Sequence, residues 1–369
     1  MATILFYSPF NQRSRDNESV MLGFKQQGHR VISLSQAEGR QIHPFLQSNG
    51  IETFTHVVGT GSWVIKFLNH LFHFILFCYK NKVDFVYSHL ESANFVSVVG
   101  QFFIRAQVFV CRHHIDEAAL RGFDKSVSYR LTYKLAEKII VVSNKALKYS
   151  IHVEKIDADK IYKINLGYDF NLFEKPMPAE ISKIKNEASN SLLLLTVGRL
   201  TKYKRADLAL LVLKKLAVKN IDARLIILGT GEDELRLRNL ITVLGLENMV
   251  SLKGHVSNVM DYVYAADFIL HPSIMESSCV VVKEAGLVEK PVIVCEGIGD
   301  FDDYIVNDKN GFCVPQESDL FVEVAYDIIL TNFKNKEKLN RIGSELRARV
   351  IELFGIENTI KLHNELIKK

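Results

Sequence analysis

Short apolar runs alternate with longer stretches of helical periodicity along the whole chain. In the first half, we expect buried strands at Thr3–Tyr7, Arg30–Leu34, Asp84–Ser88, Gln107–Cys111 and Lys138–Val142. In the second half, we expect them at Ser191–Val197, Ala223–Leu228, Met249–Leu252, Phe268–His271, Val292–Cys295 and Phe312–Val314. Strands that alternate with helices form parallel sheets through right-handed crossovers. The pattern therefore predicts two doubly wound, Rossmann-like α/β series.

The two series are separated by a polar stretch near Phe173–Pro178. A chain of 369 residues is long for a single core. We therefore expect an N-terminal domain at 1–172, joined by a C-terminal helix at 354–369, and a second domain at 190–350. In open α/β sheets, ligands bind beyond the carboxyl ends of the strands. Functional residues are expected in the loops after strands, with the two domains facing across a cleft.

One expected helix, Trp63–Tyr79, carries many apolar residues and a single polar stripe. Lys66, Asn69, His70 and His73 form this stripe, because their spacing is i, i+3, i+4, i+7. The segment is too short and too polar to span a bilayer. We favour a largely buried helix with one wet edge over a helix that docks on a membrane surface. Peripheral membrane contact stays open as the alternative.

Net charge and cysteine content indicate which partners and which cellular compartment to expect. The net charge of +4 is mild and gives no reason to expect a nucleic-acid partner. The five cysteines are odd in number and lack a Cys-x-x-Cys pair, which is typical of free thiols in a reducing compartment. The N-terminus lacks the features of a signal peptide. We expect a cytoplasmic protein, with a peripheral location at the inner face of the membrane as the open alternative.

Candidate binding residues follow the strands of the second half. Arg199 and Lys204 follow the strand that ends at Val197, and two positive charges at a strand end suit a diphosphate. Next come a Gly-x-Gly turn at 229–231 and a Gly-His-Val segment at 254–256. Each signal is weak alone, because surface loops commonly carry such residues.

Glu276 and Glu284 lie eight residues apart, between the strand Phe268–His271 and the strand Val292–Cys295. This spacing places Glu276 in a loop and Glu284 in the early turns of the following helix. A helix N-terminus can hold an anionic phosphate, and carboxylates beside it can hold sugar hydroxyls. The alternative is structural, since a glutamate early in a helix is favoured by the helix dipole.

Taken in order, these strand-end features resemble the C-terminal domain of the retaining GT-B glycosyltransferases of family 4. The resemblance extends over 192–315 and includes the segments Pro291–Val294 and Asn310–Phe312. It implies a GT-B fold and a nucleotide diphosphate sugar as donor, UDP- or GDP-linked. The implied donor-binding set is Arg199 and Lys204 at the diphosphate, Glu276 at the transferred sugar, Glu284 at the ribose, and Val256 and Val280. Arg199, Lys204 and Glu276 are also the implied catalytic residues.

The first half is less sharply marked. His113 follows the strand Gln107–Cys111, where the family often has a catalytic histidine, and His114 stays open as an alternative. The chain departs from the family in several places. The loop Ser8–Ser14 lacks the usual Gly-Gly, Arg205 replaces a glycine after the lysine, Leu166 replaces an asparagine, and Ser278-Cys279 replaces Phe-Gly.

The resemblance implies a hydroxyl acceptor, either a carbohydrate or a lipid-linked saccharide, in cell-surface polysaccharide or glycolipid biosynthesis. Asp300-Phe301-Asp302 matches the Asp-x-Asp pattern of metal-dependent transferases, but it also opens an expected helix, where acidic residues are favoured. We therefore expect no metal and no cofactor. The alternatives are a nucleotide-sugar epimerase of the same fold and a non-catalytic sugar-nucleotide-binding subunit. A nicotinamide dehydrogenase is disfavoured, since the first strand lacks the Gly-x-Gly-x-x-Gly turn.

Overall fold

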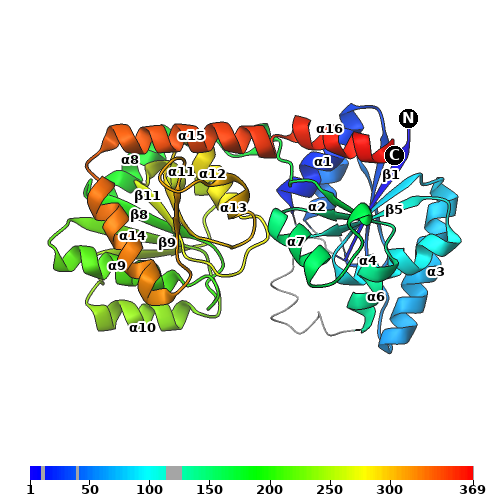
Figure 1. Ribbon diagram of the computed structural model, residues 1–369, viewed down its shortest axis with the longest axis horizontal. Coiled ribbons are helices and arrows are strands. Elements are labelled where there is room, and N and C mark those ends of the chain that lie inside the picture. The colour runs from blue at the N-terminus through cyan, green and yellow to red at the C-terminus, as the bar shows by residue number, and fades with distance from the viewer. Residues whose placement is uncertain (10–12, 39–40, 114–126, 369) are drawn as a thin grey trace. The chain divides into compact units, whose positions relative to one another are not determined.

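The computed structural model describes residues 1–9, 13–38, 41–113 and 127–368. The chain divides into two compact units (Figure 1). Unit 1 comprises Met1–Phe170 and Leu353–Lys369, and unit 2 comprises Asn171–Glu352. Each unit is built on one parallel sheet with helices in the connections. The predicted pair of doubly wound α/β sheets is confirmed.

The sheet of unit 1 has the strand order β3-β2-β1-β4-β5-β6-β7. Its strands are β1 (Thr3–Ser8), β2 (Arg30–Ser35), β3 (Glu52–Thr55), β4 (Phe85–His89), β5 (Gln107–Arg112), β6 (Lys138–Val141) and β7 (Ile161–Lys163). All strands expected in this half are present. The sequence pattern missed the two edge strands, β3 and β7, because both are short and neither is a buried apolar run.

Both faces of this sheet are covered by apolar packing, and neighbouring strand residues contribute to opposite faces. Val86 of β4 belongs to one buried cluster with Phe74, whereas Tyr87 belongs to the other with Phe24 and Ile360. The described helices are α1 (Arg15–Gln26), α2 (Ile42–Ser48), α3 (Trp63–Asn81), α4 (Glu91–Gly100), η1 (Gln101–Phe103), α6 (Val127–Leu135), α7 (Asn144–His152), η3 (Ala158–Lys160) and α16 (Ile356–Ile367).

The C-terminal helix α16 packs into unit 1 through close contacts at glycine. A Cβ atom placed on Gly167 would lie 2.5 Å from the Cβ of Thr359, and one on Gly23 would lie 2.7 Å from a side-chain atom of Ile360. The neighbouring Tyr168 donates its N–H to the carbonyl of Phe354 at 2.8 Å. The last helix is therefore an integral part of unit 1.

Helix α3 differs from the expectation of a largely buried helix with one wet edge, and that expectation is wrong. Its polar stripe is partly covered, because the His73 ring stacks on His56 at 3.7 Å between centroids and Asn69 lies 2.7 Å from the His56 Nε2 atom. Its apolar side is exposed instead, as at Leu68 (54%) and Phe72 (66%). Among the described helices, none is both long and apolar enough to cross a membrane.

The sheet of unit 2 has the strand order β10-β9-β8-β11-β12-β13, and every strand expected in this half is present. These strands are β8 (Leu192–Val197), β9 (Ala223–Leu228), β10 (Val250–Gly254), β11 (Phe268–His271), β12 (Val292–Cys295) and β13 (Phe312–Val314). The helices are α8 (Pro178–Glu187), α9 (Ala206–Val218), α10 (Glu234–Leu244), α11 (Val259–Ala265), α12 (Val280–Leu287), α13 (Phe301–Tyr304), α14 (Ser318–Asn332) and α15 (Lys336–Phe354). The order reverses at β8, which is where doubly wound sheets place their ligands.

The contact between Gly167 and Thr359 generates a stability prediction. We expect Gly167→Ala to lower the free energy of unfolding by about 1–3 kcal/mol, because the added methyl group would clash with Thr359 of α16. Gly59→Ala is the matched control, since a Cβ atom on Gly59 would meet nothing within 4 Å. Urea denaturation of both variants checks this, and equal stabilities would show that the close contact is dispensable.

Candidate active site

The loops that follow β8, β9 and β10 are joined to one another by backbone hydrogen bonds. Leu200, after β8, donates its N–H to the carbonyl of Thr230 at 3.0 Å. Gly229, after β9, donates its N–H to the carbonyl of Gly254 at the end of β10, at 2.7 Å. The predicted Gly-Arg, Gly-x-Gly and Gly-His-Val segments therefore lie together at the carboxyl edge of the sheet.

The Gly-x-Gly turn is required by this close backbone packing. A Cβ atom on Gly229 would lie 2.0 Å from the carbonyl oxygen of Gly198, and one on Gly231 would lie 2.2 Å from that of Leu200. Gly229 also has a φ of +122°, which side-chain-bearing residues rarely adopt. The glycines thus have a structural reason that is independent of any ligand.

Lys204 and Glu276 form an ion pair at the same edge. Lys204 lies in the loop between β8 and α9, and Glu276 lies in the loop between β11 and α12. The Glu276 carboxylate also accepts a hydrogen bond from the Nε2 of His271, the last residue of β11, at 2.6 Å. The three side chains are largely or fully buried, with exposed fractions of 20%, 10% and 4%. One carboxylate is therefore shared by two basic groups.

The groups of this cluster shift one another's pKa values toward their charged forms. Burial alone would raise the pKa of Glu276, but His271 and Lys204 lower it to about 2. Burial alone would lower the pKa of His271, but Cys279 and Glu276 raise it to about 9. Burial also opposes the charge of Lys204, yet Glu276 raises the pKa of this lysine above its usual value. At neutral pH the carboxylate is ionised and both partners are protonated.

Cys279 lies directly before α12 and completes a set of possible metal ligands. Ligand atoms of His271, Glu276 and Cys279 all lie within 4.8 Å of one another. Nitrogen, oxygen and sulfur ligands of this kind suit zinc. A metal bound there would face the ammonium group of Lys204, which already pairs with Glu276. The Glu276 carboxylate is thus already engaged by Lys204 and His271.

Helix α12 places the second glutamate in the interior of unit 2. Glu284 is only 3% exposed, and Val280 at the start of the helix is half-buried. Cys279, at the N-cap, does not cap the helix with its side chain. The structure therefore places Glu284 in the early turns of α12, as the spacing predicted.

The two aspartates of the Asp-x-Asp segment are engaged by different partners. Asp300 is buried and pairs with Lys283 at 2.7 Å, and it accepts a hydrogen bond from the hydroxyl of Ser278 at 2.5 Å. Burial raises the pKa of Asp300, and Lys283 opposes this effect. Asp302 accepts the N–H of Gly297 at 2.9 Å. These contacts give both carboxylates a structural role in holding the loop around α12.

Two arginines near the end of β8 have different environments. Arg199 is exposed, and its side chain has no recorded hydrogen bond or ion pair within the described part of the chain. Arg205 adopts a left-handed conformation, with φ of +52°, where the family has glycine. Its guanidinium donates to the carbonyls of Pro272 and Gln316 at 2.7 and 2.5 Å. Arg205 thus ties loops together, whereas Arg199 remains available to an anionic ligand.

Val256, the predicted contact to the base, lies two residues beyond β10 and is half-buried. Gly254 before it has a φ of +67°, and the register between β10 and β9 shifts between Leu252 and Gly254. This irregularity turns the chain away from the sheet at the predicted position. The hydrogen bond from Gly229 to Gly254 places the segment beside the glycine turn.

The histidine candidate of unit 1 lies directly after β5. His113 Nε2 lies 2.9 Å from Nδ1 of His89, at the end of the neighbouring strand β4. Burial, followed by His113 and His363, holds the pKa of His89 well below its usual value, so His89 is neutral. Both rings line a small hollow with Asp16 and Tyr87. His114 lies outside the described residues.

The first loop, where the sequence lacks Gly-Gly, ends in an ion pair. Arg13 donates to Glu18 of α1 at 2.5 and 2.8 Å, and its guanidinium lies 3.9 Å from the ring centre of Phe45. Residues 10–12 lie outside the described part of the chain. Within the part described, Arg13 stabilises the start of α1.

Sequence reasoning missed His271 and His89 as partners of the candidate residues. Each is the last residue of a buried strand, and each contacts a candidate from another loop, Glu276 or His113. A histidine that ends an apolar run was the available signal. It was weak, because such a residue is usually satisfied within its own loop.

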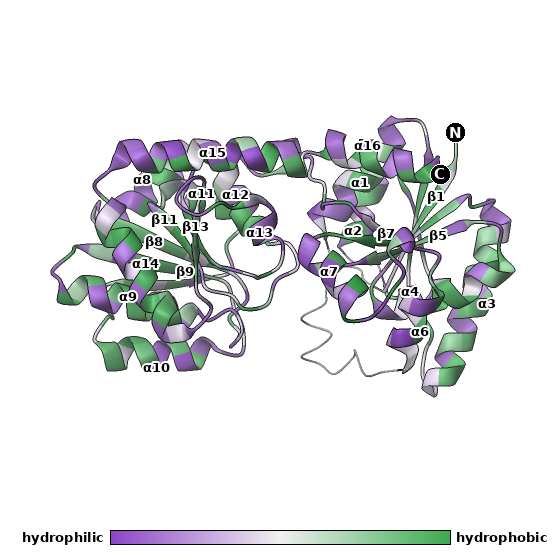
Figure 2. Cartoon of the chain, in the orientation of Figure 1, coloured by the Kyte–Doolittle hydropathy of each residue, from purple (hydrophilic) through white to green (hydrophobic). Residues whose placement is uncertain are grey.

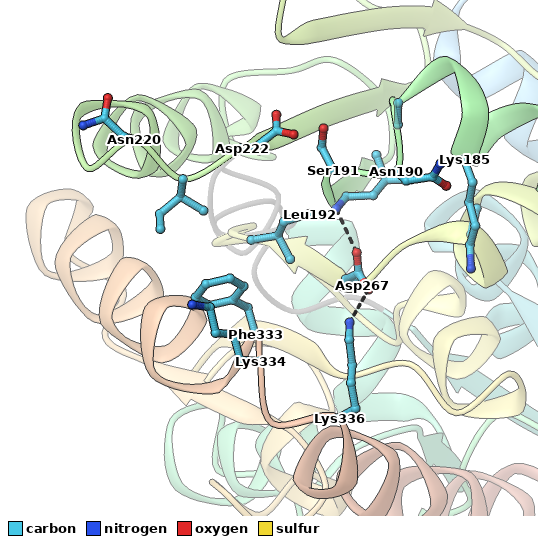
Figure 3. Close-up of a pocket in the computed structure, with 14 residues that line it drawn as sticks. Lys185, Asn190, Ser191, Leu192, Asn220, Asp222, Asp267, Phe333, Lys334 and Lys336 are labelled. Atoms are coloured by element: carbon cyan, nitrogen blue, oxygen red, sulfur yellow. Dashed lines mark hydrogen bonds and ion pairs between the residues drawn. The ribbon is translucent and has the colours of Figure 1, made fainter.

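A hollow at the other edge of the unit 2 sheet is lined by Lys185, Asp222, Asp267 and Lys336 (Figure 3). Asp267, which precedes β11, accepts the N–H of Leu193 at 2.9 Å and pairs with Lys336 at 3.0 Å. This is the amino-terminal edge of the sheet. Ligands of open α/β sheets bind at the opposite edge, so we assign these contacts to stability.

Comparison with solved structures identifies the fold. The chain is similar to HepE of Anabaena, solved in complex with UDP, with a TM-score of 0.84, 20% identity and coverage of 99% of both chains. Two parallel-sheet α/β units with this likeness define the GT-B fold, and the prediction of that fold is confirmed.

The match to a family model lies within unit 2. Residues 178–349 match the family model described as glycosyl transferases group 1. A glycosyltransferase of Haemophilus influenzae is 28% identical over 49% of this chain and 49% of its own length. The UDP-Gal:alpha-D-GlcNAc-diphosphoundecaprenol alpha-1,3-galactosyltransferase of Escherichia coli is 23% identical over 79% of this chain and 77% of its own. The chain spans about half the length of the first of these relatives.

The shared charges of the cluster predict a pH dependence of stability. Because the pKa of His271 in the folded state, about 9, exceeds its usual 6.5, its stabilising contribution is complete below pH 6.5 and is lost as the pH rises through 9. Between pH 6 and 9.5, we expect the free energy of unfolding of the unchanged protein to fall by about 3 kcal/mol more than that of the His271→Gln variant. Urea denaturation at both pH values measures this difference.

His152→Gln provides the matched control, because His152 is exposed and distant in sequence from the cluster. This variant should show the same pH dependence as the unchanged protein. A His271→Gln variant that loses stability between pH 6 and 9.5 as steeply as the unchanged protein would contradict the assigned charge state.

Proposed function

We propose that the chain is a glycosyltransferase that moves a sugar from a nucleotide diphosphate sugar to a hydroxyl acceptor with retention of anomeric configuration. The observation that carries this proposal is the Lys204–Glu276 pair at the carboxyl edge of the unit 2 sheet, next to the loops after β8, β9 and β10. The match of 178–349 to the group 1 glycosyl transferases supports the same activity.

The donor is proposed to be a UDP-sugar. HepE was solved with UDP, and the name of the Escherichia coli relative specifies UDP-Gal as its donor. In this chain, Val256 would contact the base, Glu284 the ribose hydroxyls, and Val280 the region between phosphate and sugar. The burial of Glu284 supports a binding role, since a buried carboxylate can hold hydroxyl groups without competition from water.

Arg199 and Lys204 are proposed to stabilise the charge that grows on the leaving diphosphate. Preorganised positive groups in a partly dry site stabilise such charge more than they stabilise the bound substrate. Arg199 has no recorded partner among the described residues, and Lys204 holds its proton despite burial because of Glu276. The N-terminus of α12 lacks a side-chain cap and adds further favourable dipole charge.

Glu276 is proposed to bind the transferred sugar rather than to act as a general acid. A group with a pKa of about 2 has no proton to donate at neutral pH. Its ionised oxygens are strong acceptors for sugar hydroxyls. The hydrogen bond from His271 fixes the orientation of the Glu276 carboxylate, so His271 is a positioning residue for Glu276.

The acceptor is proposed to be a carbohydrate or a lipid-linked saccharide of a cell-surface polysaccharide or glycolipid. The name of the Escherichia coli relative specifies a diphosphoundecaprenol acceptor, which supports this class. His113, held by His89, is the candidate acceptor-side residue. All five cysteines are free thiols, which supports the proposed cytoplasmic location.

The proposed roles predict the kinetics of two variants. We expect Arg199→Ala and Lys204→Ala each to lower kcat with a UDP-sugar donor by about 100- to 1000-fold, with a much smaller effect on donor affinity. Release of UDP in the presence of acceptor extracts measures the rate, and calorimetry measures the affinity. Lys202→Ala is the matched control, because it removes an exposed positive charge from the same loop.

Unchanged transfer by both variants would refute the proposed site. An epimerase of the same fold would convert the sugar of the donor without any acceptor, so product analysis with donor alone separates the two activities. A non-catalytic binding subunit would bind the UDP-sugar but would form no free UDP from it. Thermal shift with UDP-, GDP- and ADP-sugars identifies the donor, since a bound ligand raises the apparent stability.

A further inference from the structure

Unit 1 carries a large exposed apolar surface on α3 and η1, which we name the apolar face. It is formed by residues that are each between 50% and 66% exposed: Val64, Ile65, Leu68, Phe72, Leu76, Tyr79, Phe102 and Phe103. Soluble monomers rarely leave so many large apolar side chains together in contact with water. In Figure 2, the ribbon of α3 is mostly in the hydrophobic colour. This face has no role in the candidate active site.

The apolar face is continuous because of the helical spacing and one hydrogen bond. Ile65, Leu68, Phe72, Leu76 and Tyr79 follow one another at intervals of three or four residues, so they lie on one side of α3. The Tyr79 hydroxyl donates to the carbonyl of Phe103 at 2.8 Å, which joins α3 to η1. The face thus extends from the helix to the neighbouring turn.

The orientation of α3 is set by packing on its other sides. Phe74 and Phe77 are buried in unit 1, and a Cβ atom on Gly100 would lie 2.7 Å from the Phe74 ring. The polar stripe meets His56 through His73 and Asn69. Burial, followed by His56, His73 and Lys66, lowers the pKa of His70 to about 4, so this ring is neutral. The helix cannot turn its apolar side inward without breaking these contacts.

Basic side chains predominate around the apolar face among the described residues, although Asp84 lies near Tyr79 and Glu91 lies near Trp63. Helices α3 and α6 and the segment 101–107 contain no aspartate or glutamate. They contribute Lys66, Lys80, Arg105, Arg130 and Lys134. Lys66 and Lys80 are exposed and lie on the polar stripe beside the apolar face, where a long side chain can keep its apolar stem on a hydrophobic surface and its ammonium in water.

We infer that the apolar face docks on an anionic lipid bilayer, with α3 lying in the interface plane. An amphipathic helix with Phe, Leu and Tyr on one side and lysines beside that side has the composition of such helices. Tyr79, 58% exposed, is a residue type enriched at membrane interfaces. A second copy of the chain fits less well, because a two-fold contact through this face would oppose the same lysines. This inference does not depend on the proposed activity.

The test compares binding of the full chain to vesicles of phosphatidylcholine with binding to vesicles that also contain phosphatidylglycerol. We expect binding to the anionic vesicles and at least tenfold loss in Leu68→Gln/Phe72→Gln. Leu235→Gln/Val243→Gln on α10 is the matched control, because these side chains are 71% and 81% exposed in unit 2. The control should bind like the unchanged protein. Thermal unfolding by circular dichroism verifies that both variants are folded.

A second pair of variants tests the charge beside the apolar face. Lys66→Gln/Lys80→Gln should weaken binding to anionic vesicles by about fivefold for each lysine removed, and high salt should reduce this difference. The matched control is Lys219→Gln/Lys309→Gln, which removes two exposed lysines from unit 2.

Several outcomes would overturn the inference. Absence of binding to anionic vesicles at physiological salt refutes it directly, and so does equal loss of binding in the α10 control. Equal binding to neutral vesicles refutes the role of charge. A concentration-dependent dimer in sedimentation velocity, abolished by Leu68→Gln/Phe72→Gln, assigns the face to a second copy of the chain. Because the assay measures lipid binding alone, its result is independent of donor turnover.

Discussion

The candidate site depends on the contacts that the Glu276 carboxylate makes with two basic side chains. This carboxylate is held by Lys204 from one loop and by His271 from the end of a buried strand. Removing water from these groups is costly, and only their mutual attraction keeps each of them charged. The pKa of Glu276 is accordingly low and that of His271 is high. A cluster of this kind is rigid and polarised before any ligand arrives, which is the arrangement that electrostatic catalysis requires.

This cluster is supported by close backbone packing rather than by further charges. The loops after β8, β9 and β10 touch one another through glycine, at distances that exclude a side chain. Arg205 adds contacts that tie the first of these loops to the loops after β11 and β13. The exposed Arg199 is then presented by a closely packed set of loops. One packed set of turns therefore forms the edge at which we propose donor binding and presents a cation there.

Helix α3 illustrates how a pattern can be read correctly while its orientation is assigned wrongly. The periodicity of Lys66, Asn69, His70 and His73 identified a single polar stripe. It did not show that His56, from the segment after β3, would cover part of that stripe. Burial, followed by His56, lowers the pKa of His73, which favours the neutral form of the His73 ring in this stack. The wide apolar side is left outward as a consequence.

The sequence alone determined the order of the buried strands, the helix that carries Glu284 and the loops that carry Arg199, Lys204 and Glu276, because these follow from local periodicity and turn chemistry. It missed the edge strands β3 and β7, because both strands are short and their residues are partly exposed. Only the tertiary structure decided that His271 shares Glu276 with Lys204, that His89 meets His113, and that α3 faces outward. Those contacts join residues from different loops and strands, and their energies depend on burial and distance, which no local pattern encodes.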